Sequence, residues 1–220
     1  MTAPLAVVFD MDGLMFNTED VYWLVGTELL RRRGCCFGRE LSDAMMGRPP
    51  QSSFDVMIRW HSLDATWQEL AAESEEIYLK LLDERLAPMP GLMELLTALE
   101  KAHIAKAIGT SSSRRSLEAI LSRFAMEPRF QFTLTAEDIA RGKPDPEIYL
   151  KAAARFGIPP SQILVLEDSQ TGCRSAAAAG ALVVAVPGAH SIRQDFSAAT
   201  LVLNSLADRR LYELLELPGT

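Results

Sequence analysis

The stretch that decides the fold of this 220-residue chain is Leu5-Ala-Val-Val-Phe-Asp-Met-Asp-Gly-Leu-Met-Phe-Asn-Thr18. A short apolar run changes abruptly to two carboxylates, Asp10 and Asp12, and then to Gly13. Such a run predicts a buried parallel strand, and ligands bind at that end of the strands in open α/β sheets. Because residues two apart on a strand point the same way, we expect the carboxylates to converge. The alternative is a pair of solvated acids that merely end a strand.

Composition and charge limit the partners that this chain can have. The formal net charge is −7, and the only run of basic residues, Arg31–Arg33, lies on a helical pattern where we expect a helix end or an exposed face. Nucleic-acid binding needs a basic surface and is not expected. A signal peptide, a membrane span and a membrane partner are not expected either. The three cysteines form no C-x-x-C pair, so we expect a reducing, cytoplasmic location.

Hydrophobic periodicity after Thr18 predicts helices and no strands as far as Leu86. The turn Gly47-Arg48-Pro49-Pro50 interrupts this helical pattern. We therefore expect a separate all-helical domain at residues 17–87, inserted directly after the first strand. The predicted helical segments are 21–30, 41–46, 53–61 and 67–86.

From Leu92 onward, strand and helix patterns alternate. This alternation predicts an α/β core, a Rossmann-like parallel sheet with helices on both faces, formed by residues 1–16 and 88–220. The predicted helices are 92–101, 111–124, 146–156 and an Ala-rich segment around 175–179. The predicted strands are 104–110, 130–134, 163–166, 182–186 and 201–203.

Three further polar clusters lie at the ends of predicted strands or before helices. The turn Thr110-Ser111-Ser112-Ser113 opens a helix, which suits a phosphate, although a plain helix cap would look the same. Lys143 precedes a proline and is expected in extended backbone, either aimed at a site or at the surface. Glu167 and Asp168 end an apolar strand as metal ligands or as ordinary turn acids.

These clusters are chemically complementary. Two unit charges about 4 Å apart repel by roughly 4 kcal/mol at an effective dielectric of 20, so converging acids need a cation. Oxygen ligands favour a hard ion such as Mg²⁺. Lysine and a hydroxyl turn would then bind an anion, and the set would form a clamp for a phosphoryl group. The acids concerned are Asp10, Asp12, Glu167 and Asp168.

Four motifs in order resemble those of the haloacid dehalogenase-like superfamily. They are Phe9-Asp10-Met11-Asp12-Gly13, the Thr110 turn, Gly142-Lys143-Pro144-Asp145-Pro146 and Leu166-Glu167-Asp168-Ser169. The resemblance spans nearly the whole chain. It is strongest to the subgroup with a helical cap after the first motif, which includes β-phosphoglucomutase-like phosphatases.

The resemblance implies a Mg²⁺-dependent phosphatase that acts on a small phosphorylated metabolite through an aspartyl-phosphate. Asp10 would be the nucleophile, and Asp12 would protonate the leaving alcohol and then activate water. Thr110, Ser111 and Lys143 would bind the phosphoryl group. The implied metal ligands are Asp10, the backbone carbonyl of Asp12 and Asp168, with Glu167 supporting or ligating.

Departures from the family pattern narrow the reaction. Asp12 favours phosphate esters, because the namesake dehalogenases and phosphonate-cleaving members lack this second carboxylate. Mutases of the β-phosphoglucomutase type carry a histidine where this chain has Tyr22, which favours hydrolysis over phosphosugar mutase chemistry. A non-catalytic binding module is disfavoured because all four motifs are retained. Tyr22 and Arg48 are the candidate specificity residues, and we expect a monomer.

Overall fold

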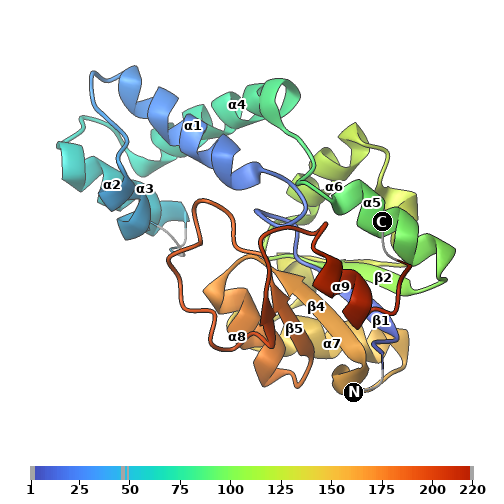
Figure 1. Ribbon diagram of the computed structural model, residues 1–220. Coiled ribbons are helices and arrows are strands. Elements are labelled where there is room, and N and C mark those ends of the chain that lie inside the picture. The colour runs from blue at the N-terminus through green and yellow to red at the C-terminus, as the bar shows by residue number, and fades with distance from the viewer. Residues whose placement is uncertain (1–2, 46–47, 49, 219–220) are drawn as a thin grey trace. The chain divides into compact units, whose positions relative to one another are not determined.

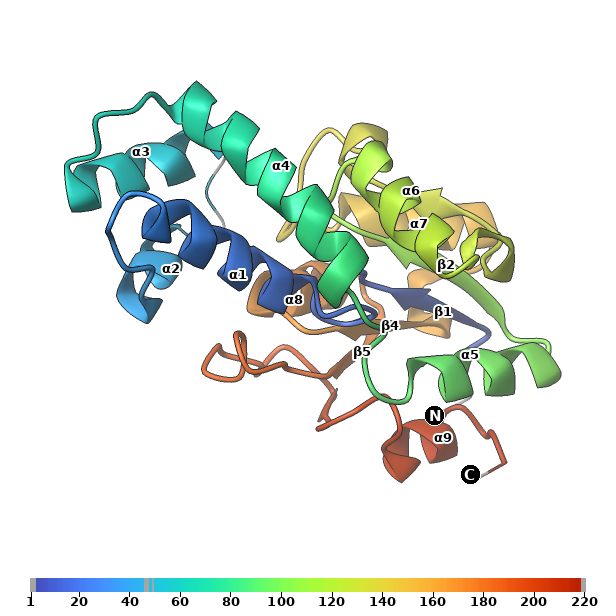
Figure 2. The same cartoon turned by 90° about the horizontal axis from the view of Figure 1, so that it is seen from above.

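The computed structural model describes residues 3–45, 48 and 50–218, and the chain divides into two compact units. One unit comprises Met1–Asn17 with Ala87–Thr220, and the other is Thr18–Leu86. Figures 1 and 2 show helices around a sheet in the first unit and helices alone in the second. None of the helices within the described ranges is long and apolar enough to cross a membrane.

The larger unit is built on a six-stranded parallel sheet with the order β3-β2-β1-β4-β5-β6. The central strand, β1, pairs with β2 and β4, so that Val8 lies between Ala107 and Val165. The chain runs outward from β1 in one direction and then returns to build the other side, so β1 marks a topological switch point. The strands are β1 Ala6–Phe9, β2 Ala105–Gly109, β3 Thr133–Leu134, β4 Ile163–Glu167, β5 Leu182–Ala185 and β6 Leu201–Val202.

Helices cover both faces of this sheet, which confirms the predicted α/β class (Figure 1). On one face, Ala6 and Val8 of β1 belong to a buried cluster with α7 and α8. Crossovers through α5 and α6 link β1 to β2 and β2 to β3, and right-handed crossovers place these helices on the opposite face. The helices are α5 Leu92–Lys101, α6 Arg114–Arg123, α7 Glu147–Phe156, α8 Gln170–Ala178 and α9 Arg209–Leu214, with short 3-10 turns at Glu127–Arg129, Ala136–Asp138 and Pro160–Gln162.

The sequence predictions differ from the structure mainly at the starts of elements, and β3 covers only Thr133–Leu134 of the strand predicted at 130–134. Helix α6 begins at Arg114 and not at Ser111, because Ser113 is its N-cap and accepts a hydrogen bond from the Ser116 amide. Helix α8, of which the sequence indicates only the Ala-rich part, begins at Gln170, because the Ser169 hydroxyl caps it. Helix α9 was not predicted, and the Asp208 side chain caps it.

The smaller unit consists of four helices and, in its described residues, no strand. They are α1 Thr18–Arg31, α2 Arg39–Met45, α3 Pro50–His61 and α4 Trp67–Arg85. A capping box of Thr66 and Glu69 starts α4. The basic run at the end of α1 pairs across to α4, where Arg32 and Arg33 reach Glu73 at 2.9 and 2.6 Å. The arginines therefore join two helices as well as lying at a helix end.

A glycine at the start of α5 gives the first testable prediction. Gly91 has φ +88°, and a Cβ there would overlap the backbone of Leu206 and Ala207 before α9. Gly157 has φ +71° with nothing within 4 Å of such a Cβ. We expect Gly157→Ala to cost about 1–2 kcal/mol from backbone strain alone, and Gly91→Ala to cost clearly more. Urea denaturation of both variants measures this, and equal losses would contradict the close approach.

Candidate active site

The predicted site residues lie at the carboxyl edge of the three central strands. Asp10 and Asp12 follow β1, Thr110 follows β2, and Glu167 is the last residue of β4. The strand register sets these residues side by side, because Phe9 lies opposite both Ile108 and Leu166. The ladder continues into the site, where the Asp10 amide donates to the Leu166 carbonyl at 2.9 Å.

A buried lysine joins the carboxylates of two strands. The Nζ of Lys143, from the loop before α7, lies 2.5 Å from Asp10 Oδ1 and 2.6 Å from Glu167 Oε1. It also donates to the Gly109 carbonyl at 3.0 Å. The lysine side chain is only 6% exposed, so these contacts lie in a medium that screens charge poorly. The structure thus places Lys143 inside the site and not at the surface.

Three buried acids form a cluster that suits a metal ion. Asp10, Glu167 and Asp168 each offer an oxygen, and these atoms lie within 4.8 Å of one another. Burial raises the pKa of Asp10 to about 8, against the charge of Lys143, and the charges of Glu167 and Asp12 add to the rise. Burial lowers the pKa of Lys143, but Asp10 and Glu167 outweigh it and hold that pKa well above its ordinary value. Three carboxylate oxygens at this separation form a donor set that fits a hard divalent cation.

Glu167 is surrounded by protein donors on both oxygens. Oε1 accepts from Lys143 and from the Tyr149 hydroxyl at 2.8 Å. Oε2 accepts from the Asp168 amide at 3.1 Å and from the Ser169 amide and hydroxyl at 3.2 and 3.0 Å. A Cβ at Gly172 would overlap this carboxylate, so glycine is needed there. These contacts favour the supporting role over the ligating one for Glu167.

Asp12 was expected to converge with Asp10 but is not part of the acid cluster: its carboxylate is held by hydroxyls, although its charge still adds to the raised pKa of Asp10. Asp12 Oδ2 accepts from Ser112 Oγ at 2.7 Å and from Thr110 Oγ1 at 3.3 Å. Its Oδ1 is buried and has no hydrogen-bond partner among the described residues. Leaving a buried acceptor unsatisfied costs about 1–3 kcal/mol, so this oxygen calls for an explanation. Ser111, the predicted partner of Thr110, is exposed, and its role in phosphate binding stays a prediction.

Sequence reasoning missed two residues of this site. The sequence indicates Ser112 only as one residue of the hydroxyl turn, and Tyr149 only as part of a predicted helix. The signal for Tyr149 was present, because it is a tyrosine on the buried face of α7 beside Ile148 and Ala152. A buried tyrosine hydroxyl usually needs a partner. No sequence signal distinguished Ser112 from its serine neighbours.

The candidate specificity residues lie in the smaller unit. Tyr22 is 44% exposed and stacks on Tyr78 with ring centroids 4.8 Å apart. The Arg48 side chain donates from Nε to the Ala44 carbonyl at 2.7 Å. The neighbours Gly47 and Pro49 in the predicted turn lie outside the described residues. A role for Tyr22 or Arg48 in substrate contact therefore stays a prediction.

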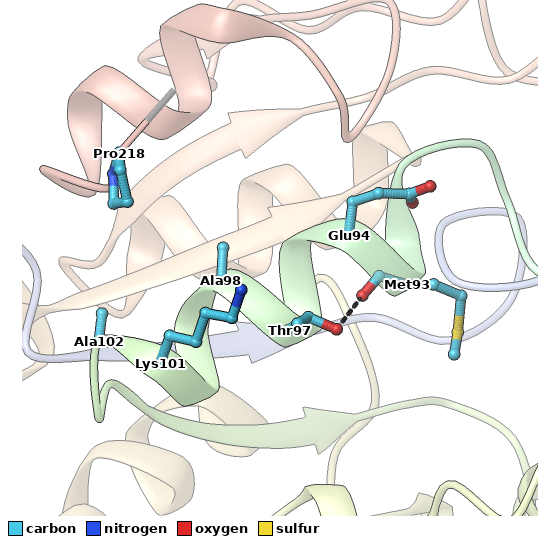
Figure 3. Close-up of a pocket in the computed structure, with 7 residues that line it drawn as sticks. All are labelled: Met93, Glu94, Thr97, Ala98, Lys101, Ala102 and Pro218. Carbon is cyan, nitrogen blue, oxygen red and sulfur yellow. Dashed lines mark hydrogen bonds between the residues drawn. The ribbon is translucent and has the colours of Figure 1, made fainter. Parts of the chain in front are cut away.

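A separate pocket in the larger unit is lined by none of the predicted site residues. It has a volume of about 580 Å³ and runs along α5 beside Pro218 (Figure 3). Thr97 in its wall donates to the Met93 carbonyl at 2.8 Å. Its other lining residues are Glu94, Ala98, Lys101 and Ala102. The pocket lacks the convergent acids and the buried lysine found at the sheet edge, so it is not the candidate site.

Comparison with known proteins finds haloacid dehalogenase-like hydrolases, both by sequence and by structure. The model of the haloacid dehalogenase-like hydrolases matches residues 7–186. A probable pseudouridine-5'-phosphatase from Drosophila melanogaster is 33% identical over 207 residues, which cover 91% of this chain and 89% of that protein. The β-phosphoglucomutase of Bacillus subtilis is 29% identical, over 96% and 93% of the two chains. A solved HAD family hydrolase from Deinococcus radiodurans R1 with bound phosphate and sodium superposes with TM-score 0.84 at 27% identity, covering 100% of both chains.

The buried lysine gives a prediction for stability. Removing one partner of a buried ion pair typically costs about 3–5 kcal/mol, because the other charge stays uncompensated. In the presence of a chelator we expect Lys143→Met to lower the free energy of unfolding by about this amount. The control is Lys151→Met, which removes an exposed partner of Glu147 at 2.7 Å and should cost less than about 1 kcal/mol. Equal losses in urea denaturation would contradict a special role for the buried pair.

Proposed function

The chain belongs to the haloacid dehalogenase-like hydrolases and is a phosphatase of that family, and we propose that it hydrolyses small phosphorylated metabolites, with Mg²⁺, through an aspartyl-phosphate on Asp10. The observation that carries this proposal is the buried contact of Lys143 with Asp10 and Glu167, at 2.5 and 2.6 Å. It brings a carboxylate nucleophile and a fixed positive charge to one point. Attack on phosphorus needs both at that point.

The reaction has two steps that use the same two aspartates. In the first, an Asp10 oxygen bonds to phosphorus, the bond from phosphorus to the ester oxygen breaks, and Asp12 gives its proton to the departing alcohol. In the second, a water oxygen bonds to phosphorus and passes a proton to Asp12. The bond from phosphorus to Asp10 then breaks, which releases inorganic phosphate and restores both carboxyls.

Lys143 would orient the nucleophile and stabilise the transferring group through its positive charge, because its three N–H donors already reach Asp10, Glu167 and the Gly109 carbonyl. Its Nζ fixes Asp10 Oδ1 and is itself fixed by Glu167, so the charge is oriented before substrate arrives. A donor oriented in advance stabilises developing negative charge without reorganising during the reaction. Thr110 lies at the same edge, but its hydroxyl donates to Asp12 Oδ2 at 3.3 Å, so its contact with the phosphoryl group stays a prediction.

The acid cluster is the proposed site of Mg²⁺. Asp10 and Asp168 would hold the ion together with the backbone carbonyl of Asp12. Glu167 would not bind the ion but would orient its surroundings, since it accepts from Lys143 and from the Asp168 amide. When bound, the ion supplies positive charge that neutralises the acids and the phosphoryl oxygens. Without it, the like charges of the cluster would disfavour an ionised Asp10.

A phosphosugar mutase is the second candidate, favoured by the similarity to a β-phosphoglucomutase. Tyr22 stands where mutases of this type carry a histidine, so hydrolysis is the better proposal. An assay of phosphate release from phosphosugars and nucleoside monophosphates, with isomerisation followed in parallel, separates the two. Release of phosphate without isomerisation supports the phosphatase. Isomerisation of a phosphosugar without net release of phosphate would instead show that the chain is a mutase.

The nucleophile is tested by Asp10→Asn. An amide matches the carboxylate in shape but does not form the phosphoryl bond, so we expect phosphate release to be lost and the fold to be kept. Release from the substrate panel and thermal unfolding measure the two effects. The matched control is Asp64→Asn at an exposed position, which should retain activity. Substantial turnover by pure Asp10→Asn protein would remove Asp10 as nucleophile.

The metal is tested by binding as well as by activity. A chelator should abolish phosphate release, and Mg²⁺ should restore it. Mg²⁺ at about 100 times its dissociation constant should stabilise the fold by roughly 2.7 kcal/mol. Asp168→Asn should shift this titration to higher Mg²⁺ concentration. Full activity in excess chelator, or an unshifted titration, would contradict the proposed site.

A further inference from the structure

We propose that Ser112 is a positioning residue for Asp12, fixing Oδ2 so that Oδ1 is the oxygen that gives and takes the proton. The inference rests on the proposed function and deepens it by assigning roles to the two oxygens of one carboxylate. The two carboxylate oxygens of Asp12 differ in their hydrogen-bond partners. Oδ2 accepts hydrogen bonds from two hydroxyls, whereas Oδ1 is buried without a partner among the described residues.

The hydrogen bonds around Ser112 run in a fixed direction. Its hydroxyl carries a single proton, which is directed to Asp12 Oδ2 at 2.7 Å. Its amide donates to Thr110 Oγ1 at 3.0 Å, and that hydroxyl in turn lies 3.3 Å from the same Asp12 oxygen. Ser112 therefore acts on Oδ2 directly and also orients the second hydroxyl that reaches it.

The backbone holds Ser112 from both sides. Its carbonyl accepts from the Ala136 amide at 3.1 Å, which joins the turn to the segment after β3. Two residues earlier, the Thr110 amide donates to the Leu134 carbonyl at 3.0 Å. On the other side, Ser113 caps α6. Because the turn is anchored at three neighbouring residues, the Ser112 hydroxyl has a defined position from which to orient Asp12.

Esters with different leaving groups depend to different degrees on the proton that Asp12 supplies. A poor leaving group, such as an alkoxide, needs a proton from Asp12 as its bond to phosphorus breaks. A good one, such as 2,4-dinitrophenolate, departs without it. If Ser112 places the proton donor, its loss harms the first kind of ester more than the second. If Ser112 only binds phosphate or supports the turn, both esters suffer alike.

The experiment compares kcat/KM for an alkyl phosphate and for 2,4-dinitrophenyl phosphate in the full-length, Mg²⁺-supplied protein. This parameter covers the steps up to formation of the aspartyl-phosphate. General acid catalysis typically contributes 10²–10⁴-fold. We expect Ser112→Ala to lower the ratio of the alkyl to the aryl value about tenfold or more, and Ser112→Thr, which keeps a hydroxyl, to recover most of it.

Two variants make the result decisive. Ser113→Ala removes the α6 cap next door and should leave the ratio unchanged, because the Ser113 hydroxyl pairs with Ser116. Ser112→Cys keeps the size of serine with a weak donor, and it replaces the alanine variant if that protein does not fold. A wild-type protein that releases no phosphate from any ester defeats the proposed function itself. An active wild type with an unchanged ratio in Ser112→Ala, or in Ser112→Cys in its place, overturns only the role of Ser112.

Discussion

The contact of one buried ammonium group with two buried carboxylates is the constraint on which this structure depends. Lys143 reaches Asp10 and Glu167 with a side chain that is only 6% exposed. Charges removed from water are costly unless they are paired and hydrogen-bonded. The chain must therefore supply Lys143 and its partners from three segments far apart in sequence and hold them at fixed separations. A parallel sheet does this because its strands end along one edge.

Hydrogen-bond donors around this contact compensate the buried carboxylate of Glu167 for its loss of water. Glu167 receives the Tyr149 hydroxyl from α7 and two backbone amides from the turn that opens α8. Gly172, in the first turn of α8, leaves the space in which the Glu167 carboxylate lies. The helices that cover one face of the sheet thus serve the site as well as the core. A structural role and a chemical role fall on the same residues.

The two aspartates of the first motif differ because their surroundings differ. Asp10 lies among acids and a lysine, where burial raises its pKa to about 8. Asp12 lies two residues further on, where the hydroxyls of Thr110 and Ser112 donate to its Oδ2. Environments that differ in this way allow two identical side chains to take different roles in one reaction. The separation arises where β1 ends, since the chain turns at Gly13, with φ +76°, directly after Asp12.

The sequence by itself determined the class of fold, the succession of strands and helices along the chain as far as β6, and the acids and lysine that lie at the sheet edge. These features are local, since an apolar run that ends in acids or an amphipathic period is complete within about ten residues. Tertiary structure alone decided which hydroxyl reaches Asp12, where α6 begins, that Tyr149 contacts Glu167, and that Glu167 is enclosed by donors. The direction of a side chain in a turn depends on backbone angles that distant segments impose. Ser112 is chosen over Ser111 in a turn anchored to Leu134 and Ala136, a partnership that no pattern within residues 110–113 encodes.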